Sequence, residues 1–127
     1  MPQGEPLVIH FGLNDFAHVG EVEYWIVNDR TNNYCGKFLF LFAGQRCPLH
    51  YHKIKDETFF VVKGRVALEV NGEHVLLNEG DIYKMAPGWN HTFAAEGGPA
   101  LVLEVSLPSL PDDNFFADAR IGRKGVI

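Results

Sequence analysis

The sequence predicts an all-β protein with a single domain, and two observations lead to this expectation. Its 127 residues contain many short apolar runs that are rich in β-branched and aromatic side chains, and turn sequences separate these runs. No window carries a clear apolar repeat of 3.6 residues, and residues 8–17 are expected to hold at most a weak helical turn. Eight or more short strands with regular turns are typical of a sandwich or a barrel.

The expected strands follow one another closely along the chain. The run at 37–43 is apolar on both faces, as expected for a strand packed between two layers. Asn71-Gly72 separates two runs, and Asn-Gly is the strongest short signal for a hairpin. In chain order, the expected strands cover residues 22–27, 37–43, 58–62, 66–70, 74–77, 82–85, 91–94 and 100–105.

The character of the chain changes after residue 106. We expect residues 1–106 to form the barrel, including one or more N-terminal strands, and residues 107–127 to form an irregular C-terminal arm. Phe115 and Phe116 are the expected apolar anchors of this arm, on the body or on a second subunit. The residues that break any strand there are Pro108, Pro111, Asp112 and Asp113.

The composition of the chain argues against some classes of binding partner and some cellular compartments. A net charge of −5 and a pI near 5.6 argue against a nucleic-acid-binding protein, which normally carries a basic stripe. No run approaches the roughly 18 apolar residues of a membrane span, and the N-terminus has no secretory signal. We therefore expect a cytoplasmic protein with a small-molecule substrate. The apolar strand at 24–26 and the aromatic arm also predict a homodimer, since pairing covers open sheet edges.

One run of the chain carries a metal-ligand pattern. His50 and His52 are one residue apart, so on an extended segment they point to the same face. Glu57 follows after a distance that allows the chain to turn, and His91 is the downstream counterpart. Three imidazoles and one carboxylate suit one divalent transition metal such as Mn, Fe, Ni, Co or Zn. No such spacing recruits the three other histidines, which are His10, His18 and His74.

The two cysteines are expected to be reduced, because cytoplasmic disulfides are scarce. Cys47 precedes His50 by three residues and is a conceivable softer ligand. Its odd offset from His50 predicts that it lies on the opposite face of the strand.

Residues that share parity with the ligands are expected to line the barrel interior. Phe59 and Val61 follow Glu57 at even offsets and Phe93 follows His91, so the cavity is expected to be apolar, with Phe38, Phe40 and Phe42 nearby. Lys55 is either an ordinary loop charge or a proton donor at the cavity mouth. The other polar candidates inside the barrel are Tyr83, Glu104 and Glu69.

Two motifs of the chain resemble those of the cupin superfamily. The first is Gly44-x5-His50-x-His52-x4-Glu57-x6-Gly64, and the second runs from Gly80 to His91. The second motif departs from the family at Ala86 and at Ala95, where proline and asparagine are usual, and neither position is a metal ligand. The resemblance covers roughly residues 35–106. It implies a double-stranded β-helix (jelly-roll) barrel with a metal inside its mouth, and commonly a dimer.

The stretch from His50 to Glu57 is also similar to sugar-isomerase and sugar-phosphate cupins of the D-lyxose isomerase type. Such enzymes hold a metal on three histidines and a glutamate, with a lysine two residues before the glutamate, where this chain has Lys55. The known isomerases of that type are longer, so the match covers the ligand region alone.

Three functions follow from these residues. The first is a metal-dependent isomerase or epimerase of a small sugar or sugar acid, in which the catalytic candidates are Lys55, Glu104 and Tyr83. The second is a non-haem metal dioxygenase, in which Glu57 doubles as a base. The third is a non-enzymatic cupin that binds a small ligand or a metal. The fold alone does not decide among them.

Overall fold

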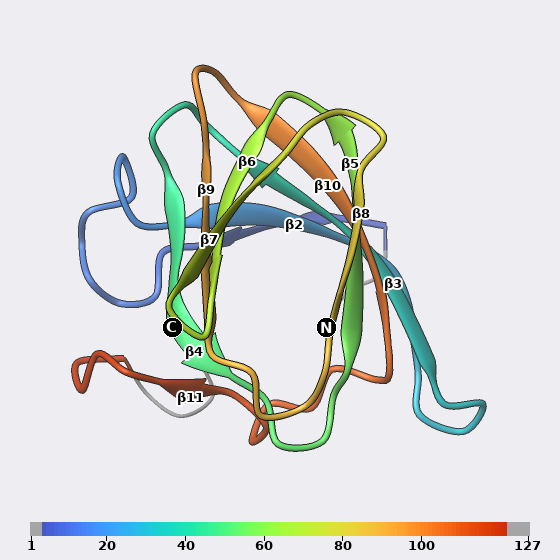
Figure 1. The fold of residues 1–127 in the computed structure, drawn as a ribbon. Coiled ribbons are helices and arrows are strands. Elements are labelled where there is room, and N and C mark those ends of the chain that lie inside the picture. Colours follow the sequence, from blue (N-terminus) through green and yellow to red (C-terminus); the bar gives the residue numbers. More distant parts are fainter. Residues whose placement is uncertain (1–3, 122–127) are drawn as a thin grey trace.

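Two antiparallel β-sheets face each other in the computed structural model, which describes residues 4–121 (Figure 1). No helix is found within these residues, and hence none that could span a membrane. The strands are β1 (Pro6–Ile9), β2 (Glu21–Asp29), β3 (Tyr34–Leu41), β4 (Arg46–Tyr51), β5 (Glu57–Lys63), β6 (Val66–Val70), β7 (Glu73–Leu77), β8 (Ile82–Met85), β9 (His91–Ala95), β10 (Ala100–Ser106) and β11 (Phe115–Phe116).

The order of the strands makes the two sheets a jelly roll. The larger sheet has the order β1-β2-β3-β10-β5-β8 and the smaller has the order β11-β4-β9-β6-β7. From β3 onward nearly every connection crosses from one sheet to the other; the β6–β7 hairpin is the exception. The all-β jelly roll expected from the sequence is confirmed. Because β4 and β5 follow each other in opposite sheets, residues at the end of β4 and the start of β5 can meet in the interior.

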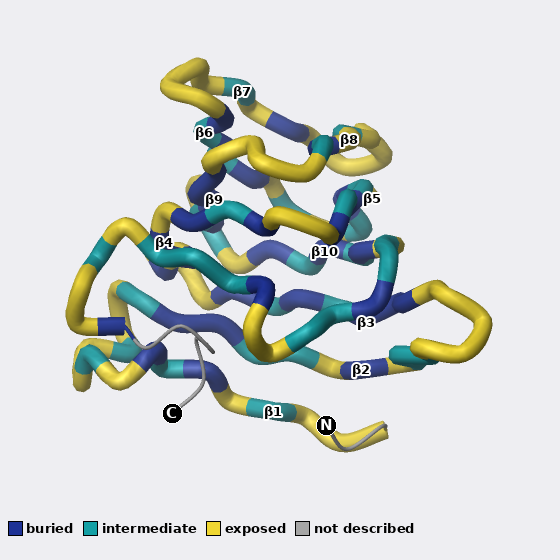
Figure 2. The backbone as a smooth tube through the Cα atoms, turned by 90° about the horizontal axis from the view of Figure 1, so that it is seen from below, coloured by how far each residue is buried: buried dark blue, intermediate teal, exposed yellow. Residues whose placement is uncertain are grey.

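The β6–β7 hairpin has the turn that Asn-Gly predicts. Asn71 and Gly72 have φ angles of 50° and 84°, the positive values that a type I′ turn requires at both central positions. Val70 pairs with Glu73 across the turn, and the tip of the hairpin is exposed (Figure 2).

The elements in the first half of the chain differ in their bounds from those expected. Residues 6–9 form β1, which pairs with β2. A turn follows at residues 15–19, where Val19 N donates to Asp15 O at 2.8 Å. β3 covers Tyr34–Leu41 and not 37–43, because the chain turns after Leu41, where Gln45 N donates to Phe42 O at 3.0 Å. Gly44 has a φ of +80° in this turn, a value that favours glycine.

The core lies between the two sheets. Phe59, Val61 and Phe93 are buried, as the parity argument expected, and the rings of Phe59 and Phe93 meet edge to face at 5.1 Å. Phe38 and Phe40 lie on the outer face instead, and Phe42 is 51% exposed. The reason is the alternation along β3, which turns Leu39 and Leu41 inward.

Gly64, in the turn from β5 to β6, shows why glycine is needed at that motif position. Its φ is +78°, and a Cβ atom there would lie 2.3 Å from the carbonyl oxygen of Pro99. Any side chain would push the β5–β6 turn away from the start of β10.

The described residues after β10 contain one short strand and are otherwise irregular. Phe115–Phe116 forms β11 and pairs with β4, so this part of the arm continues the smaller sheet. The aromatic anchors were expected on the body or on a second subunit. Tyr51 stacks on Phe115 with ring centroids 5.0 Å apart, which places that anchor on the body of the same chain. Residues 122–127, the end of the expected arm, lie outside the described residues.

Candidate metal centre

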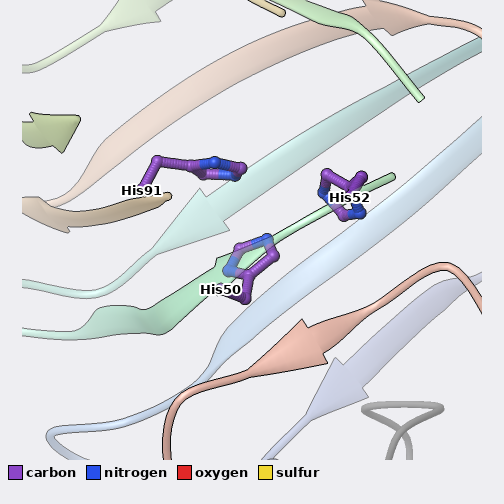
Figure 3. Close-up of side chains that lie close together, drawn as sticks. All are labelled: His50, His52 and His91. Atoms are coloured by element: carbon purple, nitrogen blue, oxygen red, sulfur yellow. The ribbon is translucent and has the colours of Figure 1, made fainter. Parts of the chain in front are cut away.

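Three histidines from neighbouring strands meet inside the barrel. His50 in β4 pairs with His91 in β9, and His52 follows directly after β4. One ring nitrogen of each lies within 4.8 Å of those of the other two, and all three residues are buried. Figure 3 shows the three rings around a shared space. The shared face of His50 and His52 expected from their spacing is therefore present.

Backbone carbonyl oxygens fix the tautomer of each histidine. A carbonyl oxygen can only accept a hydrogen bond, so the Nδ1 atom next to it carries the proton and Nε2 keeps its lone pair. Partners of this kind orient metal-binding histidines in proteins. The distances are 2.7 Å from His50 Nδ1 to Pro48 O, 2.8 Å from His52 Nδ1 to Asp113 O and 3.0 Å from His91 Nδ1 to Trp89 O.

Glu57 brings a carboxylate to the same point from the other sheet. Its Oε2 atom lies 2.9 Å from His52 Nε2 and 3.3 Å from His91 Nε2. Burial alone would raise the pKa of Glu57, but the charge of Lys55 and the interactions with His91 and His52 outweigh it and hold the pKa well below its usual range. Burial, followed by the proximity of His91 and His52, lowers the pKa of His50. The cluster thus combines an ionised carboxylate with a neutral imidazole.

The donor set fits a divalent metal ion. Among the described residues, three buried side-chain atoms have no hydrogen-bond partner, and they are His52 Nε2, Glu57 Oε2 and His91 Nε2. Leaving buried polar atoms unpaired is costly, and a shared cation would satisfy all three. Nitrogen and carboxylate donors suit Zn, Fe, Ni, Co and Mn, so the residues present match the metal that the sequence predicted.

Cys47 lies on the inner side of β4, which corrects the expectation that it faces away from His50. The register of β4 against β9 shifts between these two residues, and such a bulge reverses the alternation of side chains. Cys47 Sγ is 3.8 Å from His50 Nδ1. Burial and the nearby Glu21 raise the pKa of the thiol, which argues against a thiolate ligand.

A cavity of about 170 Å³ opens beside the histidines. Part of its wall is apolar, with Phe11, Leu39, Phe93 and Phe116. Phe11 and Phe116 were not expected at the site, because one follows a short edge strand and the other belongs to the arm. The expected apolar lining is present, but of the five phenylalanines expected at or near the cavity, Phe93 alone lines it.

The opposite part of the wall carries buried charges. Lys55 Nζ donates to Glu104 Oε2 at 3.2 Å and lies 3.4 Å from Ser109 Oγ. Both Lys55 and Glu104 are at most 5% exposed, and both line the cavity. Burial alone would lower the pKa of Lys55, yet the carboxylates of Glu104 and Glu57 raise it. Lys55 is therefore a buried ammonium group, not a loop charge in solvent.

A second lysine continues this charged wall and was missed in the sequence. Lys37 Nζ lies 3.5 Å from Glu23 Oε1 and 4.0 Å from Glu104 Oε2, and it sits over the ring of Trp25. Burial would lower the pKa of Lys37, but Glu104 and Glu23 raise it strongly. The signal in the sequence was the alternation of side chains along the strand, which places Lys37 on the same inward face as Leu39 and Leu41.

Glu21 stands at the end of the same wall. Burial, then the charge of Glu23, raises its pKa well above the usual value, so Glu21 holds a proton where Glu23 does not. Burial would also raise the pKa of Glu23, but Lys37 lowers it. The wall thus consists of charged groups that end in one neutral carboxyl group, Glu21.

The structure does not bring every candidate to the cavity. Tyr83 pairs with Phe59 across β8 and β5 and packs against the core without lining the cavity. Glu69 faces His74 on the outside of the smaller sheet, at 3.8 Å. His18 is paired with Asp15 at the surface, at 2.9 Å.

Residues 39–106 match the family described as Cupin domain. The chain belongs to the cupin family. A D-lyxose/D-mannose isomerase of Thermosediminibacter oceani is 34% identical over 143 aligned positions, which cover 91% of this cupin and 78% of that protein. The similarity to this isomerase therefore extends well beyond the ligand region.

Two further proteins are similar to this cupin, one in structure and one in sequence. An L-ribose isomerase of Acinetobacter sp. DL28, solved with L-ribose, superposes with a TM-score of 0.84 at 16% identity, over 94% of this cupin and 83% of that chain. A quercetin 2,3-dioxygenase of Bacillus subtilis is 26% identical over 87% of this cupin but over 34% of that protein. The fold likeness thus extends over nearly the whole chain for the isomerase.

Proposed function

We propose that this cupin is a metal-dependent isomerase that interconverts the aldose and ketose forms of a small sugar. The observation that carries the proposal is the buried pair of Lys55 and Glu104 in the wall of the cavity that His50, His52 and Glu57 also line. The relatives named D-lyxose isomerases support the same class of reaction.

His50, His52, His91 and Glu57 are the residues that would hold one divalent metal. When bound, such an ion acts as a Lewis acid that polarises a carbonyl and its adjacent hydroxyl. The three carbonyl-bound Nδ1 atoms hold the rings in place before any ion arrives.

Lys55 and Glu104 have different roles in the proposed reaction, one as a hydrogen-bond donor and the other as a base. Because its pKa is raised, Lys55 stays protonated and acts as a hydrogen-bond donor to a sugar oxygen. An ammonium group has three donors, and two of them already point to Glu104 and Ser109, which leaves one for the substrate. Glu104 is then the base that takes the proton from the carbon beside the carbonyl and returns it to the carbonyl carbon, and the proton of the adjacent hydroxyl passes to the carbonyl oxygen. Tyr83 has no part in this mechanism.

The size of the cavity favours a monosaccharide. A volume of about 170 Å³ is below the roughly 300–1,000 Å³ of pockets for drug-sized ligands. The charged wall offers donors and acceptors to hydroxyl groups, whereas Phe93 and Phe116 offer an apolar surface to the carbon face of a sugar ring.

The test is conversion of D-lyxose, D-mannose and L-ribose by protein stripped with EDTA and then loaded with Mn²⁺, Co²⁺, Ni²⁺ or Zn²⁺. We expect ketose formation under anaerobic conditions with at least one metal and none in the stripped protein. Activity that requires dioxygen, with no ketose formed, would replace the isomerase with a dioxygenase. Metal binding without either reaction would favour a cupin that only binds its ligand.

The outer face of the larger sheet supports a homodimer. Tyr24, Phe38, Leu103, Phe60 and Ile82 stand opposite one another in one cross-strand row over five strands. Of these, Ile82 is 67% exposed and Tyr24 is 41% exposed, and Val105 on the same sheet is 50% exposed. A continuous apolar row of this kind marks an interface in soluble proteins. We propose that a second copy of the chain covers it, and that the protein works in the cytoplasm, where its free Cys35 and Cys47 stay reduced.

A further inference from the structure

The described part of the C-terminal arm, residues 107–121, touches the candidate site at several points. Ser109 N donates to Asn28 Oδ1 at 2.9 Å, which ties the start of the arm to β2. Further along, Phe116 stacks on the ring of His50, with centroids 5.1 Å apart and planes at 30°. The arm is therefore fixed on both sides of the stretch that contains Asp113.

Asp113 is a buried carboxylate that gathers three successive backbone amides. It is 4% exposed. Its Oδ1 accepts from Lys53 N at 2.8 Å and from Ile54 N at 3.1 Å, and its Oδ2 accepts from Lys55 N at 3.0 Å. Converging N–H groups of this kind form an anion-binding concavity. The carboxylate thus sets the path of the loop that carries Lys55 into the cavity.

The backbone of the same residue holds a metal-site histidine. Asp113 O accepts from His52 Nδ1 at 2.8 Å, the bond that leaves His52 Nε2 free for an ion. His52 and Lys55 both lie in the short loop between β4 and β5. One residue of the arm therefore contacts His52 through its carbonyl and the following three residues of the loop through its carboxylate.

We propose that Asp113 is a positioning residue, which holds His52 for the metal and Lys55 for the proton-transfer pair in one fixed relation. The part that concerns Lys55 rests on the proposed isomerase function. The part that concerns His52 rests on the metal centre alone. Asp113 touches neither the metal nor a substrate, so it acts through these two residues.

The variant that tests the proposal is Asp113→Asn, which keeps the size of the side chain but replaces one carboxylate oxygen with a group that cannot accept. We expect faster hydrogen exchange of the amides of residues 53–55 in the metal-free protein. Co²⁺ binding, followed by calorimetry and by its visible spectrum, should weaken by about 10-fold, because loss of the carboxylate's bonds to the loop lets the Asp113 carbonyl oxygen shift away from His52 Nδ1. At saturating metal, kcat should fall more than KM rises, because Lys55 is misplaced.

The control is Asp112→Asn, since Asp112 is the exposed neighbour of Asp113. It should leave exchange, Co²⁺ affinity and kcat unchanged. Unchanged exchange at residues 53–55 in Asp113→Asn would overturn the role toward Lys55, and an unchanged Co²⁺ affinity would overturn the role toward His52. If the unaltered chain binds Co²⁺ but isomerises no sugar, the proposed function fails while these two measurements still decide the role of Asp113.

A second measurement uses the unaltered chain and covers the case that Asp113→Asn does not fold. Linkage requires that, if Asp113 positions His52 for the ion, the ion in turn stabilises the contacts of Asp113. Adding Co²⁺ should therefore slow hydrogen exchange at residues 53–55 and 113 more than at the β6–β7 turn around Gly72. Equal effects at both places would contradict the proposal.

Discussion

Lys55 Nζ and Glu104 Oε2 lie 3.2 Å apart, and both side chains are almost completely enclosed. A buried ion pair costs desolvation energy that its own attraction often fails to recover, so it is a weak device for stability. Its place in the wall of the cavity gives it a chemical use instead. Perturbed charged groups of this kind in a cavity are candidates for function.

Lys55→Ala should abolish most of the proposed isomerase activity without removing the metal. General acid–base groups contribute about 10²–10⁴-fold, so a rate loss of that size is expected. Metal content by mass spectrometry should stay unchanged, because Lys55 is not a ligand. The matched control is Lys53→Ala, since Lys53 is exposed two residues away. Equal activities of the two variants would refute the role of Lys55.

His52→Ala should remove most of the bound divalent metal. The substitution deletes one of the nitrogen donors and leaves Glu57 and His91 with a gap in the coordination shell. The measurement is metal content after purification without added metal, with the exposed His74→Ala as control. Full occupancy in a doubly substituted protein, His50→Ala with His91→Ala, would contradict the assigned ligands.

Glu21→Gln should raise the melting temperature of the metal-free protein at neutral pH. The folded state raises the pKa of Glu21 above the ordinary value of 4.5, so the folded state keeps a proton that the unfolded state loses. Stability from this group is present below pH 4.5 and is lost as the pH rises toward the folded pKa. Glutamine cannot ionise, so its advantage should grow as the pH rises above 4.5.

Glu23→Gln should act in the opposite direction and serves as the comparison. Lys37 lowers the pKa of Glu23 in the folded state despite its burial, so Glu23 adds stability at pH values above 4.5. Glutamine removes this contribution, and the melting temperature at neutral pH should fall. Identical pH profiles for the Glu21→Gln and Glu23→Gln proteins would show that the two carboxyl groups do not differ as described.

Phe60→Glu should convert the proposed dimer into a monomer. Phe60 is 39% exposed in the apolar row on the outer face of the larger sheet, and a carboxylate there would be buried without a partner. Light scattering should give twice the chain mass of 14.3 kDa for the unaltered protein and the single mass for the variant. Leu76→Glu, at a 47% exposed position on the other sheet, should remain a dimer. A single chain mass for the unaltered protein at all concentrations would refute the dimer.

Local patterns predicted much of the fold. The strand at residues 66–70 and the Asn71-Gly72 turn depend on neighbouring residues alone, and both were predicted with correct bounds. The shared side of His50 and His52 also follows from the two-residue repeat of a strand. These features need no knowledge of the rest of the chain.

What the sequence did not reveal depends on contacts between distant segments. The bulge in β4 reverses the side on which Cys47 lies, and its local signal, Pro48 inside the strand, was not used in the prediction. In the sequence, Asp113 was interpreted only as a strand breaker. Its role was missed because its amide partners at residues 53–55 come close to it only in the folded chain. The two-residue alternation of their strands could have placed Lys37 and Glu23 on the inward face. Charged residues are usually assigned to the surface, so this signal was not used.

The arm that completes the site follows all the strands of the barrel in sequence. The four ligand residues therefore belong to the barrel, whereas the groups that orient His52 and Lys55 belong to Asp113. A chain cut before residue 113 would keep every ligand and lose both of these contacts.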